Sequence, residues 1–186
     1  EAYKEQKIVK GFRHILQGAE KGFMLQPNFI KGLKQLSKQH YTYDLLIYAN
    51  QIQEAIELIK SVEDLPIVLD HIAKPSIKTK SMQDWEKDIR ALAKYPNLYC
   101  KISGMATEAD WTRWKAEDLK PYLDIVVEAF GVDRLMFGSD WPVCLVASSY
   151  ERWLHTIKDY FKEFSSTEQE KIFALNCESF YTLEKA

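Results

Sequence analysis

The sequence predicts an α/β fold built on a parallel β-sheet. Apolar runs with strand character alternate with segments whose apolar residues have helical spacing, and each strand–helix pair takes up roughly 30 residues. Strand–helix–strand units of this length make right-handed crossovers, which place consecutive strands side by side in the same direction. No low-complexity stretch or flexible linker interrupts this alternation, so we expect residues 1–186 to form a single domain.

Five segments have the apolar, β-branched and aromatic composition of strands. They are residues 8–16, 43–48, 66–70, 97–103 and 134–138. A closed (β/α)₈ barrel typically needs about 250 residues, whereas this chain has 186. Two arrangements therefore stay open at this point, namely an open five-stranded sheet and the last five units of a barrel.

The first two helices follow the first two strands. Phe29, Leu33 and Leu36 recur at helical spacing, with Asn28 as the expected N-cap directly after Pro27. The second helix has a single apolar stripe, formed by Ile52, Ala55, Ile56 and Ile59.

The third helix is expected to start at Ser81, with Asp84 three residues later as its capping partner. Its buried face has three members, Trp85, Ile89 and Leu92.

The fourth helix carries five apolar residues at helical spacing, Leu119, Leu123, Val126, Val127 and Phe130. Gly131 is the expected terminator. Because proline is tolerated in the first turn of a helix, Pro121 places the start between Ala116 and Lys120.

Two further helices are expected after the fifth strand, over residues 150–164 and 167–175. Ser166 and Gln169 have the spacing of a capping box for the second of them.

Composition excludes several classes of function. Hydrophobic residues make up 46% of the chain, charged residues 28%, and the net charge is −2, which gives no reason to expect a nucleic-acid or anionic-membrane partner. The three cysteines are widely spaced and form no CxxC pair, so neither a disulfide framework nor a zinc knuckle is indicated. No run is long enough to span a membrane and residues 1–20 do not resemble a signal peptide, so we expect a cytoplasmic protein.

Polar residues stand at the end of every expected strand. They are Arg13, His14 and Gln17, then Tyr48 and Asn50, then Asp70, His71 and Lys74, then Lys101 and Ser103, then Asp140 and Trp141. Polar residues at a single strand end are common, but their recurrence at five ends that share one edge indicates a site. The other histidines, His40 and His155, fall on or beside helices and are expected at the surface.

The segment "RLMFGSDWP" at 134–142 carries the most informative carboxylate. Asp140 follows a short apolar strand, and Pro142 disfavours a helical conformation for Trp141. A turn aspartate that bonds its own backbone is the ordinary alternative. The sequence has no GxGxxG after a strand, no GxxxxGK[ST], no GxSxG and no HExxH, which weakens dinucleotide, nucleotide, serine-hydrolase and zincin interpretations.

Several segments in order resemble the L-fuconolactonase-like branch of the amidohydrolase superfamily. They are "GFRHILQ" (11–17), "GFML" (22–25), "YDLLI" (43–47), "VLDHIAKP" (68–75), "CKISGM" (100–105), "PYLDIVVEAFGVDRLMFGSDWPVC" (121–144) and "NCESFYTL" (176–183). The resemblance implies a (β/α)₈ barrel whose strands four to eight, with a C-terminal helix, correspond to this chain. The family's first strand carries an HxH pair, which would lie upstream of Glu1 and does not occur here, so we expect this chain to lack the first three strands.

The resemblance also implies roles for individual residues. Asp140 corresponds to the general base at the end of strand eight, His71 to the catalytic strand-six histidine, and Arg13 to an arginine that contacts substrate oxygens. The other expected substrate contacts are His14, Tyr48, Lys74, Lys101 and Trp141. No cofactor is required, although zinc is known in neighbouring branches, and Asp140 and His71 would be its ligands if a metal is bound.

The expected function is hydrolysis of a small sugar-acid lactone resembling L-fuconolactone or L-rhamnonolactone, by water that Asp140 activates. Two alternatives stay open, a zinc-dependent decarboxylase or hydratase and an inactive barrel fragment. The second expected strand does not end in a histidine, which argues against the zinc enzyme. The expected partner is the small-molecule substrate, with self-association into a homo-oligomer left open.

Overall fold

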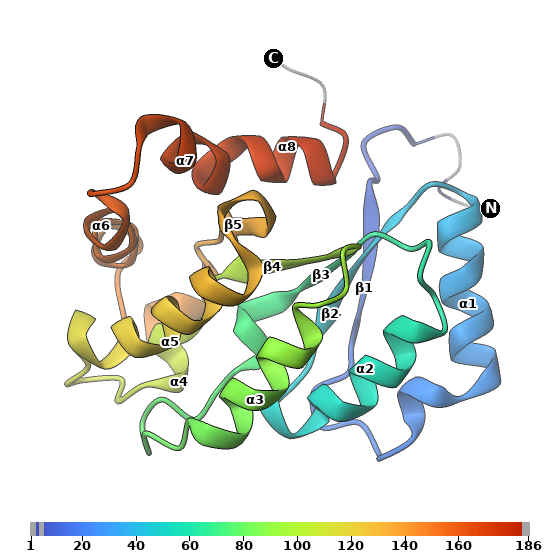
Figure 1. Ribbon diagram of the computed structural model, residues 1–186, viewed down its shortest axis with the longest axis horizontal. Helices are drawn as coiled ribbons and strands as arrows, with labels where there is room; N and C mark the ends of the chain where they lie inside the picture. Colours follow the sequence, from blue (N-terminus) through green and yellow to red (C-terminus); the bar gives the residue numbers. More distant parts are fainter. Residues whose placement is uncertain (1–2, 4–5, 184–186) are drawn as a thin grey trace.

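The computed structural model describes residue 3 and residues 6–183. Its centre is a five-stranded sheet in which neighbouring strands pair in parallel and in chain order (Figure 1). The strands are β1 (Gly11–Ile15), β2 (Thr42–Leu46), β3 (Ile67–Leu69), β4 (Leu98–Ile102) and β5 (Leu135–Phe137). All five expected strands are therefore confirmed, each shorter than its apolar run.

The strand order decides between the two arrangements that the sequence left open. A doubly wound sheet reverses its strand order at a switch point, whereas here the order runs from β1 to β5 without reversal. Sequential parallel strands with helices outside them are the architecture of a (β/α) barrel. The described residues form an arc of such a barrel, with β1 and β5 as its two edges.

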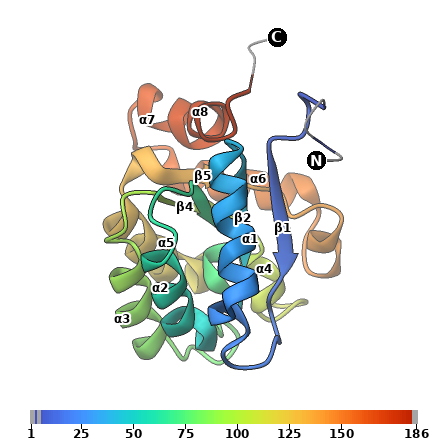
Figure 2. The ribbon, with the colours of Figure 1, turned by 90° about the vertical axis from the view of Figure 1, so that its right-hand side faces the viewer.

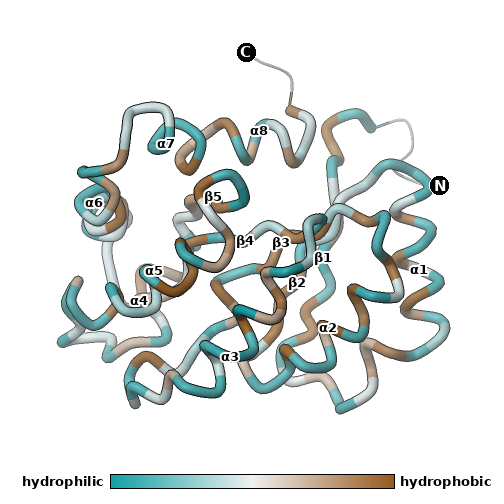
Figure 3. The backbone as a smooth tube through the Cα atoms, viewed as in Figure 1, coloured by the Kyte–Doolittle hydropathy of each residue, from teal (hydrophilic) through white to brown (hydrophobic). Residues whose placement is uncertain are grey.

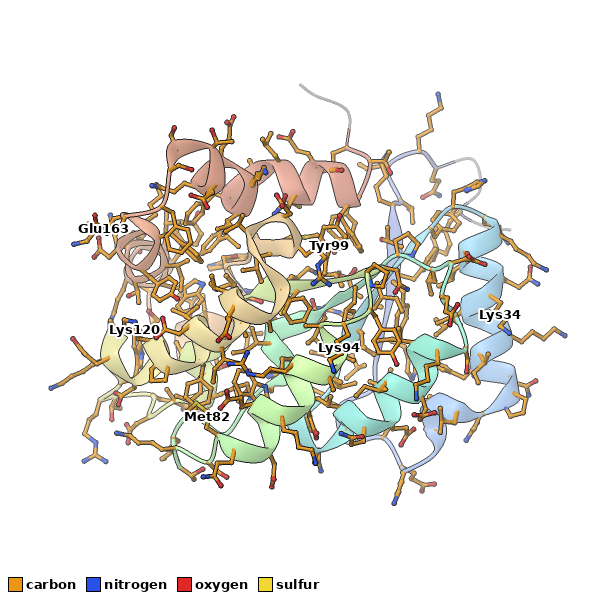
Figure 4. The ribbon with its side chains drawn as sticks, in the orientation of Figure 1. Lys34, Met82, Lys94, Tyr99, Lys120 and Glu163 are labelled. Atoms are coloured by element: carbon orange, nitrogen blue, oxygen red, sulfur yellow. The ribbon has the colours of Figure 1, made fainter. Side chains whose placement is uncertain are left out.

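Four helices pack on the outer face of the sheet, one after each of the first four strands. They are α1 (Pro27–Lys38), α2 (Ile52–Lys60), α3 (Gln83–Leu92) and α5 (Ala116–Phe130). Short helices η1 (Phe23–Leu25), η2 (Ala49–Gln51), η3 (Asp70–Ala73), α4 (Met105–Glu108), η4 (Val132–Arg134) and η5 (Val143–Val146) lie in the connections. Hydrophobic residues follow the strands and the sheet-facing sides of these helices in Figure 3, while charged side chains such as Lys34 and Lys120 project outward in Figure 4.

Helix starts differ from the expectations by one or two residues. The N-cap of α1 is Gln26, not Asn28, because Pro27 takes the first helical position, where its missing N–H is not needed. The helix α3 starts at Gln83, and Ser81 makes no capping hydrogen bond. The helix α5 starts at Ala116 as expected, but Pro121 is its sixth residue and so lies in the second turn.

After β5 the chain forms α6 (Tyr150–Phe161), α7 (Ser166–Glu170), a π-helical turn (Lys171–Leu175) and α8 (Asn176–Phe180). The α6 helix ends three residues before the expected Phe164. The capping box of α7 is formed by Ser165 and Glu168, one residue earlier than the expected pair.

The C-terminal helix lies on the inner face of the sheet, opposite the outer helices. Figure 2 shows β1 pointing away from the end at which α7 and α8 lie. Phe180 packs against Val68 and Met136, and its ring is 5.0 Å from that of Tyr99, labelled in Figure 4. Asn176 donates hydrogen bonds to the carbonyl oxygens of Val132 (2.7 Å) and Leu135 (2.8 Å). The helix therefore closes the amino end of the inner face.

Other sequence expectations can be compared with the described residues. Cys100, Cys144 and Cys177 are free thiols, and His40 and His155 are exposed. In the described part of the chain, no helix is long and apolar enough to cross a membrane.

Candidate active site

Four charged side chains form a network on the inner face of the sheet, which we call the charge network (Arg13, Asp44, Asp70 and Lys101). Lys101 Nζ lies 2.9 Å from Asp70 Oδ1 and 2.5 Å from Asp44 Oδ2. Arg13 Nη1 lies 3.1 Å from Asp70 Oδ2. Because the pleat alternates side chains between the two faces, these residues of β1, β2 and β4, with Asp70 just after β3, point away from the outer helices.

The charge network is balanced in charge, and three of its four side chains are largely buried, whereas the Arg13 side chain is 48% exposed. Its two carboxylates offset its two cations, and the Asp70 side chain is only 1% exposed. Burial lowers the pKa of Lys101, but the attraction of Asp70 and Asp44 outweighs it and raises the pKa above its ordinary value. The Tyr181 hydroxyl donates to Asp44 Oδ1 at 2.8 Å, so the segment after α8 closes the network.

A second group lies beside the network and joins His71, Ser103 and Asp140. His71 Nδ1 lies 2.7 Å from Ser103 Oγ, and His71 Nε2 lies 3.6 Å from Asp140 Oδ1. Burial lowers the pKa of His71 more than the carboxylates of Asp140 and Asp70 raise it, so the imidazole is neutral at pH 7. Asp140 Oδ2 is buried, and no donor among the described residues lies within hydrogen-bonding distance of it.

The backbone after β3 sends adjacent side chains to the two groups. Residues 71–74 all have φ between 48° and 58°, the left-handed region that L-residues rarely occupy. This turn directs Asp70 to the charge network and His71 to Asp140. Trp85 stabilises the turn, because its Nε1 donates to the Ile72 carbonyl at 2.9 Å.

The turn after β5 does not depend on the Asp140 side chain. The Ser139 hydroxyl accepts the Trp141 N–H at 3.2 Å, and Pro142 has no N–H for an aspartate two residues earlier to bind. Asp140 has φ 56°, a conformation that Asp and Asn tolerate better than most residues. The carboxylate is therefore free to face His71.

The structure brings some of the expected site residues together and separates others. Arg13, His71, Lys101 and Asp140 lie in the two neighbouring groups. Tyr48 and Lys74 line a groove of about 1080 Å³ between α2, α3 and α4, where Lys74 Nζ lies 2.8 Å from Glu108 Oε1. His14 lies apart from both groups.

His14 points to the outer face, where its ring stacks on Phe23 at 5.5 Å and lies edge-on to Phe29 at 6.1 Å. Its neighbour Arg13 points inward, so strand alternation separates two residues that the sequence places side by side. Trp141 directly follows Asp140 in the chain, and it is 64% exposed.

Sequence reasoning gave no role to Asp44, Ser103, Glu108 or Tyr181. Asp44 carried a signal, because a lone carboxylate inside the apolar run "YDLLIY" needs a buried partner. Ser103 stood among the strand-end residues, but nothing in the sequence paired it with His71. Tyr181 lies 137 residues from its partner, and no local pattern could have connected the two.

The described residues offer two of the ligands that a catalytic zinc ion needs. Such a site uses three protein ligands, and the described part of the chain contains no group of three or more His, Cys, Asp or Glu side chains able to hold a metal. Asp140 and His71 could supply one oxygen and one nitrogen. The described residues therefore do not complete a zinc site by themselves.

The arc of parallel strands and the polar groups at their carboxyl ends define a (β/α)-barrel protein with its candidate site on the face where such barrels carry chemistry. Comparison with known proteins identifies the family. The amidohydrolase family model matches residues 3–183, and the chain belongs to that family.

Three relatives illustrate the relationship. An L-fucono-1,5-lactonase from Burkholderia multivorans is 39% identical over 163 residues, covering 78% of this chain and 55% of the relative. An L-rhamnono-gamma-lactonase from Scheffersomyces stipitis is 25% identical over 200 residues, covering 95% of this chain and 60% of the relative. The crystal structure of an amidohydrolase from Burkholderia multivorans with bound zinc superposes with a TM-score of 0.89 at 34% identity. The match covers 94% of this chain and 65% of that protein. The chain spans just over half the length of the curated relatives.

Proposed function

We propose that the protein of which this chain forms part hydrolyses a small sugar-acid lactone, with Asp140 as the general base. The single observation that carries the proposal is the placement of Asp140. One of its carboxylate oxygens faces the His71 imidazole and the other is buried without a donor among the described residues. Relatives named as lactonases support the reaction class.

The reaction needs a base for water and donors for the oxyanion. The Asp140 carboxylate accepts a proton from water as the water oxygen adds to the lactone carbonyl carbon. The resulting tetrahedral oxyanion then collapses and the carbonyl carbon–ring oxygen bond breaks. Asp140 returns the proton to the departing alkoxide, which gives an open-chain hydroxy acid.

Three side chains are candidates to donate to the oxyanion or to substrate hydroxyl groups. Arg13 uses one nitrogen on Asp70 and its side chain is 48% exposed, so most of its five N–H donors stay available. Lys101 has three N–H donors and two carboxylate partners, which leaves one donor. His71 presents Nε2 toward Asp140. One such donor contributes about 3 to 4 kcal/mol to an oxyanion.

The substrate class is an aldonolactone related to L-fuconolactone or L-rhamnonolactone. A polyhydroxylated ring needs several hydrogen-bonding partners, which the charge network supplies. No step is routed through a metal, because the described residues hold only two candidate ligands. No observation on the described residues favours the zinc-dependent decarboxylase or hydratase.

The test is hydrolysis of a panel of aldonolactones by the full-length protein, followed as acid release with a pH indicator. Asp140→Asn removes the base but keeps a residue type that tolerates φ 56°, so we expect loss of activity with the fold retained. Asp159→Asn, at an exposed position on α6, is the matched control. Hydrolysis that survives in Asp140→Asn would refute the assignment, and inactivity of the unsubstituted protein on the whole panel would refute the reaction class.

A further inference from the structure

Ser103 is a buried hydroxyl to which neither the sequence nor the proposed reaction gives a role. It directly follows β4 and is 1% exposed. Its Oγ lies 2.7 Å from His71 Nδ1, and this is the hydrogen bond that the hydroxyl makes among the described residues. A buried hydroxyl on an imidazole nitrogen fixes both the orientation and the proton position of that ring.

The two sides of the His71 ring determine where its proton lies. Nε2 faces Asp140 Oδ1 at 3.6 Å, and an ionised carboxylate accepts protons but donates none. A proton on Nε2 therefore attracts the carboxylate, whereas a lone pair there repels it. With that proton on Nε2, Nδ1 is an acceptor and Ser103 is its donor.

Two glycines next to this pair occupy positions where the Cβ of any other residue would lie too close to His71 or Ser103. A Cβ on Gly104 would lie 2.7 Å from His71 Cγ and 2.8 Å from Nδ1. A Cβ on Gly138 would lie 3.0 Å from the Cβ of Ser103. Two glycines from neighbouring strand ends thus allow the imidazole and the hydroxyl to approach each other.

We propose that Ser103 is a positioning residue, which holds His71 as the Nε2–H tautomer so that this N–H faces Asp140 Oδ1. The imidazole thereby orients the carboxylate that accepts the proton from water. Ser103 does not touch the substrate in this scheme, since its hydroxyl is buried behind the ring. The inference rests on the proposed function for its catalytic consequence but not for the tautomer itself.

The tautomer is measured directly by nitrogen NMR of the full-length protein labelled with ¹⁵N-histidine. Comparison with the spectrum of His71→Gln identifies the ring signal of His71 among the histidine signals of the full-length protein. We expect the unsubstituted protein to show His71 protonated at Nε2 and unprotonated at Nδ1 near neutral pH. A ring protonated at Nδ1 would overturn the proposal, whether or not any lactone is hydrolysed.

Ser103→Ala tests the consequence. We expect a mixture of tautomers and, on the lactone that the panel identifies, a kcat about 10- to 100-fold lower with KM little changed. Thr42→Val removes another buried hydroxyl, at the far end of β2, and should change neither readout. An unchanged His71 signal or an unchanged kcat in Ser103→Ala would overturn the proposal. Inactivity of the unsubstituted protein refutes the lactonase assignment alone, because the NMR measurement still decides the tautomer.

Discussion

The attachment of the C-terminal helix to the sheet can be tested at one side chain, Asn176. Its amide group uses both N–H bonds, one to the buried Leu135 carbonyl at 2.8 Å and one to the partly buried Val132 carbonyl at 2.7 Å. Asn176→Ala leaves both acceptors without this donor. A buried acceptor left unpaired costs about 1–3 kcal/mol, and a lost partly exposed bond costs about 0.5–1.5 kcal/mol. The expected loss in the free energy of unfolding is therefore about 1.5–4.5 kcal/mol.

Equilibrium urea denaturation of the full-length protein measures this loss, with Asn97→Ala as the matched control. Asn97 makes a single amide bond of this kind, to the Leu65 carbonyl at 2.8 Å, in a partly buried position. We expect Asn97→Ala to cost about 0.5–1.5 kcal/mol. With an m-value of about 2 kcal/mol/M, Asn176→Ala should lower the urea midpoint by roughly 0.8–2.3 M and Asn97→Ala should lower it by roughly 0.3–0.8 M. A midpoint shift in Asn176→Ala no larger than in the control would refute the two-bond argument.

Three further predictions concern other parts of the chain. Glu54 accepts the backbone N–H groups of Gly22 and Met24, each at 2.8 Å. Glu54→Gln turns an NH₂ toward one of these donors, and we expect urea denaturation to show a loss of about 1–3 kcal/mol in the free energy of unfolding. Hydrogen bonding from Arg113 and Thr112 lowers the pKa of Asp110 to about 2. The ionised Asp110 carboxylate contributes its full stabilisation above the pKa near 3.9 that it has in the unfolded chain, and this stabilisation is lost as the pH falls toward about 2. In Asp110→Asn the free energy of unfolding should therefore change less between about pH 4 and pH 2 than in the unsubstituted protein. Burial raises the pKa of Cys100, so mass spectrometry should find it unmodified by iodoacetamide in the native protein and modified in urea.

Much of the fold could be predicted because the local patterns agree with the tertiary structure. The stripe Ile52, Ala55, Ile56 and Ile59 is buried on α2, and Trp85, Ile89 and Leu92 are buried on α3, as their spacing indicated. Helix starts were less certain because a proline or a neighbouring serine can shift the first turn by a residue, as at Pro27 and Ser165. The choice between an open sheet and a barrel arc needed the strand order itself.

The part of the candidate site that could be predicted is the part that follows from polar residues at the ends of the expected strands. His71 and Asp140 follow the carboxyl ends of β3 and β5, and this was inferred without coordinates, whereas Arg13 and Lys101 lie within β1 and β4 and point to the inner face. His14 lies on the other face because a strand turns each successive side chain over. The contacts of Ser103 with His71 and of Tyr181 with Asp44 join distant segments, and only a folded chain brings them into register.

The bond between Tyr181 and Asp44 also sets an order of events during synthesis. The two residues are 137 positions apart, so a ribosome releases β2 and its carboxylate long before the hydroxyl that binds it. Until then, Val68, Tyr99 and Met136 have no Phe180 to cover them, and the nascent inner face carries exposed apolar surface of the kind that chaperones recognise. Slowed or interrupted translation near the carboxyl end would prolong that exposure, so aggregation in a cell-free system should increase for ribosome-bound chains stalled before residue 176.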